Sequence, residues 1–160
     1  TVNNTPFTVT GGTPGVLAGI TINGEEGVGG GNARFKYITR PVVLAPGMDA
    51  TNIRAYITAF KPEGSQIYLY YKVLAQEDSE TLDDKSWKIM RQILPDVGYH
   101  NSDDRIEIEF DAGDEDITYT GSDGTSTYRN FKTFAVKLVG FADNPAKVPV
   151  ISNLRAIAVT

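Results

Sequence analysis

Polar and apolar residues alternate through most of the chain after residue 34, as they do in β-strands. The alternation is strict in residues 105–110, so that Ile106, Ile108 and Phe110 share one face and two glutamates face water. Further runs rich in β-branched and aromatic residues lie at 53–60, 66–74, 130–139 and 148–159. This pattern predicts an all-β antiparallel β-sandwich with six to nine short strands and at most one short helix.

In two segments the sequence pattern fits more than one local structure. Residues 61–65, Lys-Pro-Glu-Gly-Ser, join two strand-like runs either as a hairpin or as a short corner between two sheets. Residues 83–95 have apolar positions that fit one face of a two-turn helix and also, with one polar interruption, the alternation of a strand. We expect a strand in this second segment.

Residues 1–33 differ from the rest of the chain. Glycine clusters at 11–15 and 27–31 flank a short apolar stretch at 16–22. Such glycine density is typical of an arm or linker that becomes ordered by lying on something else. The second cluster is not a phosphate-binding loop, because a strand-like run follows it where such a loop needs a helix start. We therefore expect a glycine-rich arm or linker over residues 1–33 and a β-sandwich domain over residues 34–160.

The strand expected at 66–74 is apolar and aromatic on both faces. Tyr68 and Tyr70 lie where a strand at a solvated sheet surface would carry polar side chains. A large core, a contact with a neighbouring subunit or with the N-terminal arm, and a ring platform for sugars would each explain this face. Between the two functional explanations we favour the protein interface. The candidate interface or glycan-stacking residues are Tyr56, Tyr68, Tyr70 and Trp87, and Tyr99 is a further candidate for glycan stacking.

The composition fits one folded domain and excludes several kinds of chemistry. The 160 residues are 41% hydrophobic, which is enough for a single core. There is no cysteine, and His100 is the only histidine, so thiol catalysis, cysteine-ligated zinc and two-histidine metal sites are excluded within one chain. We predict no enzyme activity, no catalytic residue and no cofactor.

Charge and hydropathy limit the classes of partner that this chain can have. A net charge of −5 disfavours nucleic acid and anionic membranes, because both would repel the chain. No apolar run reaches the roughly 20 residues needed for a membrane span. The start at Thr1, without a methionine or a signal peptide, indicates a processed chain or a piece of a longer one.

Acidic residues gather between 103 and 116. Oxygen-rich clusters bind calcium, often at the loops of β-sandwiches, but the spacing of Asp111, Asp114 and Asp116 does not match an EF-hand. A solvated strand face followed by an acidic loop accounts for these residues without a metal. We therefore assign no metal ligand, and the sequence leaves calcium binding at 103–116 open.

Several segments, in a conserved order along the chain, resemble a domain of virion structural proteins of T4-like tailed bacteriophages, from the tail, baseplate and fibre region. The segments are 33–40, 47–50, 53–64, 67–74, 82–87 with Met90, 131–138 and 148–158. They cover most of residues 33–160 but not the N-terminal arm. Because they are strand and corner residues, the resemblance concerns the fold and transfers no functional residue.

This resemblance implies a jelly-roll-like sandwich, akin to carbohydrate-binding modules, that is typically a C-terminal module of a longer chain. It further implies a building or attachment unit of the phage particle. We therefore expect a non-enzymatic structural or assembly domain of a phage tail, baseplate or fibre protein, located in the virion. Its expected partners are other virion subunits in a homo-oligomer. The alternative is a carbohydrate-binding module that attaches the particle to host surface glycans.

Overall fold

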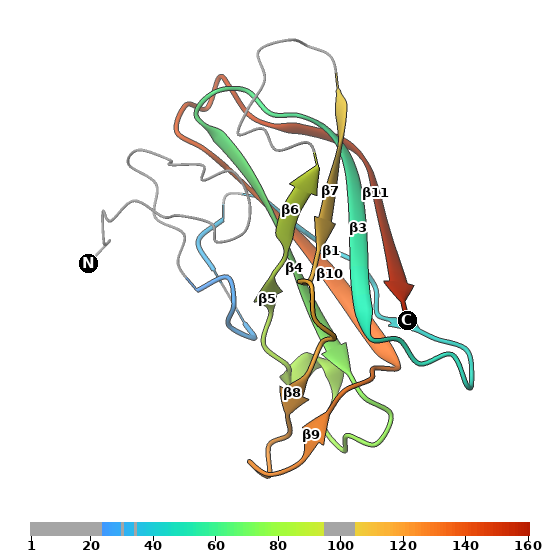
Figure 1. The fold of residues 1–160 in the computed structure, drawn as a ribbon. Coiled ribbons are helices and arrows are strands. Elements are labelled where there is room, and N and C mark those ends of the chain that lie inside the picture. Colours follow the sequence, from blue (N-terminus) through green and yellow to red (C-terminus); the bar gives the residue numbers. More distant parts are fainter. Residues whose placement is uncertain (1–23, 30, 34, 95–104) are drawn as a thin grey trace.

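The described residues form a β-sandwich of two antiparallel sheets packed face to face (Figure 1). The computed structural model describes residues 24–29, 31–33, 35–94 and 105–160. The five-stranded sheet has the order β1-β10-β4-β5, with β2 also paired to β10. Its strands are β1 (Phe35–Ile38), β2 (Val42–Val43), β4 (Ser65–Leu74), β5 (Lys88–Ile89) and β10 (Thr133–Ala142).

The second sheet has four strands in the order β11-β3-β7-β6. They are β3 (Asn52–Phe60), β6 (Arg91–Leu94), β7 (Ile106–Asp111) and β11 (Val150–Val159). A separate hairpin of β8 (Tyr119–Thr120) and β9 (Thr127–Tyr128) lies at one end of the sandwich (Figure 1). The described residues thus contain eleven strands rather than six to nine, because four of these strands have only two residues each.

The main core lies between the two sheets and is filled by alternate strand positions. On β7, Ile108 and Phe110 are 1% and 2% exposed while Glu107 is at the surface, which confirms the expected alternation. Full burial of each large apolar side chain contributes roughly 1.5–3 kcal/mol, so this layer is the main source of stability. The buried positions of β3 and β4 that face it are Ile53, Ala55, Ile57, Ala59, Ile67, Leu69, Tyr71 and Val73.

The sheet topology shows which local structure forms in each of the two segments that fitted more than one. Residues 61–64 form a corner and not a hairpin, because β3 belongs to the four-stranded sheet and β4 to the five-stranded one. The expected strand within 83–95 is confirmed at 88–94, but it is split at Met90, where the chain passes from one sheet to the other. The Met90 amide donates a hydrogen bond of 2.7 Å to Leu69 at this crossing. The residues just before it, Leu82–Asp84, form a short 3-10 helix, η1.

The outer face of the five-stranded sheet is covered by the chain itself. Tyr68 and Tyr70 are 3% and 2% exposed and form a second core with Trp87 and Leu82. Ala33, from the described part of the expected N-terminal arm, packs against the same cluster. The aromatic second face of β4 is therefore buried. It is covered by one segment that precedes β4 in the sequence and one that follows it.

A buried ion pair fixes the covering turn on this sheet. Lys137 of β10 and Glu25 of the turn at 24–29 have side chains that are each 1% exposed, with 3.2 Å between Lys137 Nζ and Glu25 Oε2. The ammonium group also donates to the Glu25 carbonyl and lies 4.9 Å from the ring centre of Tyr70 and 5.1 Å from that of Trp87. The lysine charge is thus surrounded by a carboxylate, a carbonyl and two π-faces, which compensate its loss of water.

The Glu25 carboxylate is satisfied on its other side as well. Its Oε1 accepts a hydrogen bond of 2.7 Å from the Ala33 amide and lies 3.3 Å from Lys36 Nζ. Gly31 packs so closely on this carboxylate that a Cβ there would come within 2.0 Å of it, and its φ of +126° favours glycine. One glycine of the second cluster is therefore required by the close approach of Glu25.

We predict that Glu25→Ala lowers the free energy of unfolding by about 3 kcal/mol, because removal of one partner leaves the buried Lys137 charge uncompensated. Urea denaturation followed by tryptophan fluorescence measures this loss through Trp87, the only tryptophan. The matched control is Glu26→Ala, which changes the exposed neighbour in the same turn. Equal loss in the two variants would show that the ion pair does not hold the turn.

Candidate functional site

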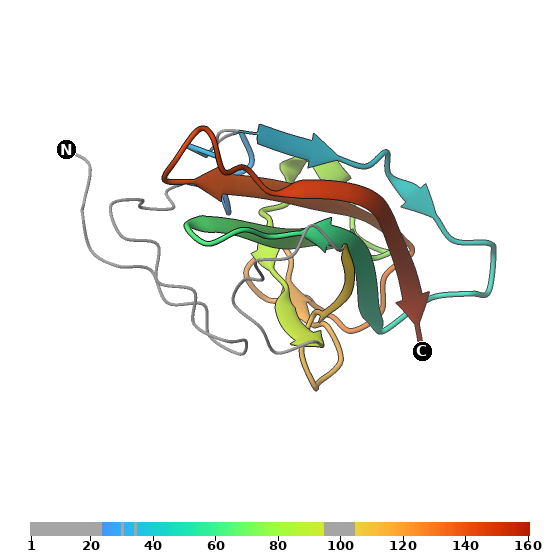
Figure 2. The same cartoon turned by 90° about the horizontal axis from the view of Figure 1, so that it is seen from above.

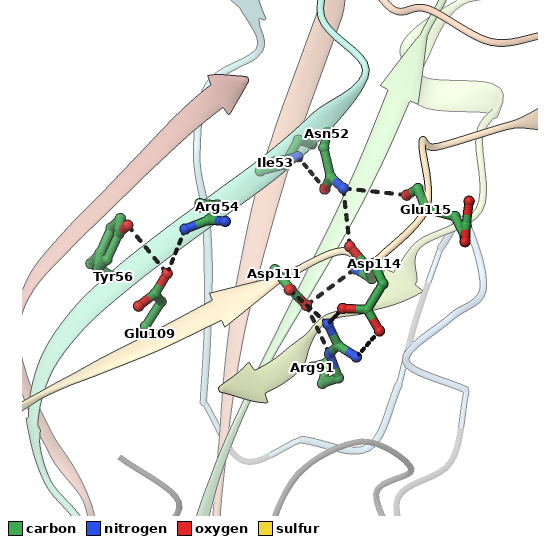
Figure 3. A network of polar contacts seen from close by, with 10 residues as sticks. Asn52, Ile53, Arg54, Tyr56, Arg91, Glu109, Asp111, Asp114 and Glu115 are labelled. Carbon is green, nitrogen blue, oxygen red and sulfur yellow. Dashed lines mark hydrogen bonds and ion pairs between the residues drawn. The ribbon is translucent and has the colours of Figure 1, made fainter. Parts of the chain in front are cut away.

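The outer face of the four-stranded sheet carries a row of polar side chains across three strands. Arg155 of β11 lies opposite Tyr56 of β3, and Tyr56 lies opposite Glu109 of β7. The Tyr56 hydroxyl donates to Glu109 Oε1 at 3.3 Å, and the same oxygen accepts from Arg54 Nη1 at 3.2 Å (Figure 3). The Arg155 guanidinium lies 5.1 Å from the Tyr56 ring centre. We call these residues, with Glu107, the polar row.

A second group of contacts joins the other edge of this sheet to the loop after β7. Arg91 of β6 donates two hydrogen bonds of 3.0 and 2.9 Å to Asp111 and two of 2.8 and 2.5 Å to Asp114 (Figure 3). These contacts hold the pKa of the Asp114 carboxyl below its usual range. Asn52 donates to the carbonyls of Gly113 and Glu115, so the loop is tied to β3 as well.

The acidic residues between 105 and 116 are therefore largely engaged by arginines. Glu107 pairs with Arg155 at 2.5 Å, and Glu109, Asp111 and Asp114 are bound as described above. Among the described residues, no group of three or more acidic or histidine side chains converges as a metal site would require. Asp103, Asp104 and His100 lie outside the described residues.

Three of the four aromatic candidates are not placed to stack on a sugar. Tyr68, Tyr70 and Trp87 are at most 4% exposed, and Trp87 is also covered by Lys72, 4.6 Å from its ring centre. In the described structure these three rings therefore present no exposed face on which a sugar could stack. Tyr56 alone is partly exposed, in the polar row, where its hydroxyl and its ring are both contacted by charged side chains. Tyr99 lies outside the described residues.

One side of the sandwich presents open strand edges. β11 pairs only with β3, and β1 and β2 pair only with β10, among the strands that the structure describes. Figure 2 shows the blue strands β1 and β2 alongside the red strand β11 on this side. The strands expose large apolar side chains, which are Tyr37, Ile38, Val42, Val43, Val150 and Ile157 at 37–67% exposure.

An apolar groove of about 530 Å³ separates β1 from β11. Phe35, Leu138 and Leu154 line it, together with Ser152, the residue at the register shift in β11. The Phe35 ring rests on Gly140, where a Cβ would come within 1.9 Å of it, so glycine is required there. A smaller cavity of about 190 Å³ continues the groove past Phe35. We call the two edges and this groove the open side.

Sequence reasoning missed the open side because sheet order is not visible in a strand pattern. The only available signal was the low charge of the last strand, which carries Arg155 as its one charged residue over ten positions. Long edge strands in monomers are usually protected by charges, prolines or bulges, and β11 has one register shift and one arginine.

Lys61 is a buried charge outside these groups. It lies in the corner between β3 and β4, is 2% exposed, and has no ion pair within the part of the chain that the structure describes. Burial lowers the pKa of its ammonium group from 10.5 to about 8. The folded chain therefore releases this proton at a lower pH than the unfolded chain does.

We predict that Lys61→Met raises the free energy of unfolding by about 1–3 kcal/mol at pH 7, where the folded protein must bury a charge. Between pH 8 and 10.5 the unfolded state binds a proton that the folded state lacks, so the unsubstituted protein gains stability and the difference shrinks. Urea denaturation at pH 7 and pH 10 measures this difference in the free energy of unfolding. The control is Lys147→Met, a substitution of an exposed lysine. A difference independent of pH would contradict the buried charge.

No family model matches the sequence, and no curated protein or solved structure matches it significantly. The described residues contain no helix that is long and apolar enough to cross a membrane. The described residues form an antiparallel β-sandwich with an open side and a polar row, in which the five-stranded sheet is covered on both faces.

Proposed function

We propose that the chain is a non-enzymatic structural domain that assembles with other virion subunits in a phage tail, baseplate or fibre. The observation that supports assembly is the open side, where two sheet edges and an apolar groove lie together. The phage context rests on the resemblance of the strand and corner segments. The jelly-roll-like connectivity and the division into an arm at 1–33 and a sandwich at 34–160 belong to the same proposal.

Backbone pairing is the interaction that the open side offers. Each free strand edge has unpaired amide and carbonyl groups, and another extended chain satisfies them by adding a strand. The low charge of β11 imposes little repulsion on such a partner, although the whole chain carries a net charge of −5. We propose a second copy of this chain as the partner. Pairing of β11 with β11 of the second copy about a two-fold axis would satisfy the free β11 edge of both copies at once.

Apolar burial adds to this backbone pairing. The exposed Tyr37 ring of β1 lines the groove, so a partner on the open side covers this ring together with the groove walls. Burial contributes about 25 cal/mol per Å² before the costs of association, and repeated contacts in a particle multiply its effect. A modest patch on each copy is therefore sufficient in a multivalent assembly.

The arrangement of the polar side chains supports a non-enzymatic role. Glu107, Glu109, Asp111 and Asp114 each hold an arginine in place across the four-stranded sheet. Cross-strand pairs of this kind stabilise a sheet, and each of these four carboxylates is already engaged by an arginine. Tyr56, bound in the same row, does not favour the carbohydrate-binding alternative.

We predict that the protein self-associates in solution and that Ile157→Lys on β11 weakens this association by about tenfold or more, because a lysine on a free edge disfavours strand pairing. Sedimentation velocity over a concentration series gives both results. The matched control, Val28→Lys, places the same charge at another exposed apolar residue, in the turn at 24–29. A monomer at all concentrations, or equal weakening by both substitutions, would contradict assembly through β11.

A further inference from the structure

The free edge of β11 has a definite pattern of unpaired backbone groups. Among the described strands β11 pairs only with β3, and it lies at the right-hand margin of the sandwich in Figure 1. The Ala112 amide donates a hydrogen bond of 3.2 Å to the Ile53 carbonyl, so the backbone groups of Ile53 point toward β7. Those of its neighbour Arg54 therefore point toward β11, where Arg54 lies opposite Ile157. It follows that β11 directs the N–H and C=O groups of residues 153, 155, 157 and 159 to β3, and those of residues 154, 156 and 158 to the free edge.

The side chains of the same strand alternate between the two faces of its sheet. Those that pack against the main core are Leu154, Ala156 and Ala158. Arg155 and Ile157 lie on the outer face, where Ile157 is 48% exposed. A strand added at this edge therefore meets an outer row formed by Arg155, Ile157 and Val159.

The charges near this edge are neutralised within the chain. Arg155 is the only charged residue among the ten of β11, and it pairs with Glu107 of β7. Lys36 of β1, on the same side of the sandwich, pairs with Glu25. A charged partner strand would lose water here without gaining a counter-charge, whereas β11 of a second copy brings no unpaired charge. The charge pattern of the edge therefore favours a second copy of this chain.

The position of a two-fold axis decides which side chains of the two copies meet. An axis at Arg155 would place two arginines face to face, and an axis at Ala156 would leave them diagonal neighbours, roughly 7–8 Å apart, with each covering an Ile157. An axis at Ala158 would leave less of β11 paired, because the strand ends at Val159. An axis at Ile157 separates the two arginines, since each Arg155 then lies opposite Val159 of the second copy. It also brings the two exposed Ile157 side chains together in a non-hydrogen-bonded pair, the pair type with the closest side chains.

We propose that two copies of the chain pair along β11 with the two-fold axis at Ile157, so that their four-stranded sheets form one continuous sheet. In this arrangement Ala156 of each copy exchanges hydrogen bonds with Ala158 of the other, and the ladder extends over residues 154–160. The two Ile157 side chains shield each other from water, which adds apolar burial to the backbone pairing. This register rests on the assembly through β11 proposed above and specifies how the two strands meet.

Disulfide trapping tests the register, because the chain contains no cysteine of its own. Opposite residues of a non-hydrogen-bonded pair have Cα atoms about 4.5 Å apart, a separation that a disulfide spans. Under mild oxidation with glutathione disulfide, we expect Ile157→Cys to form a cross-linked dimer about tenfold faster than Arg155→Cys or Val159→Cys alone. An equimolar mixture of Arg155→Cys and Val159→Cys is expected to form the mixed disulfide, which mass spectrometry of the linked peptides identifies.

Val28→Cys is the matched control, since it places a thiol at another exposed apolar residue, in the turn at 24–29. Faster linkage between Ile157→Cys and Arg155→Cys than within Ile157→Cys alone would move the axis to Ala156 and overturn the register. A protein that associates in sedimentation velocity, but whose Ile157→Cys variant links no faster than Val28→Cys, would overturn the register alone. A monomer at all concentrations would overturn the register and the assembly together.

A backbone substitution tests the pairing independently of side-chain contacts. Ala156→Pro removes an N–H group that points to the free edge and leaves the hydrogen bonds between β11 and β3 in place. We expect it to weaken association by about tenfold or more in sedimentation velocity, because each copy loses one intermolecular hydrogen bond. Urea denaturation shows whether the variant is folded, and unchanged association of the folded variant would overturn the proposed pairing.

Discussion

The buried pair of Lys137 and Glu25 determines which surfaces of this protein are available. Lys137 projects from the outer face of β10, where an uncompensated charge would cost several kcal/mol. Glu25, the Tyr70 ring and the Trp87 ring surround its ammonium group, so the turn at 24–29 and the segment before β5 are both held against the sheet. The Glu26 carbonyl accepts a hydrogen bond of 2.9 Å from the Trp87 amide and links these two covering segments to each other.

The five-stranded sheet is covered on both faces, whereas the outer face of the four-stranded sheet is in contact with water and carries paired charges. Arg54, Arg91 and Arg155 each bind a carboxylate on β7 or in the loop after it, so ion pairs connect all four strands. Exposed pairs of this kind contribute little individually, and the register of the strands is set by their buried apolar positions. The charged side chains of this face are therefore largely paired with one another within the chain.

The region proposed for contact with a partner follows from this arrangement. The open side offers unpaired backbone groups and apolar side chains, which suit another extended chain.

The sequence by itself determined the longer strands and the all-β sandwich, because side-chain alternation with a period of two is a local property of the chain. It placed Ile106, Ile108 and Phe110 on one face correctly, and it identified the second face of β4 as unusual. Only the tertiary structure decided what covers that face, since Glu25 and Lys137 are 112 positions apart and nothing local pairs them. The same holds for the corner at 61–64, the crossing at Met90 and the open edge of β11. Each depends on which strands become neighbours, and long-range packing decides that.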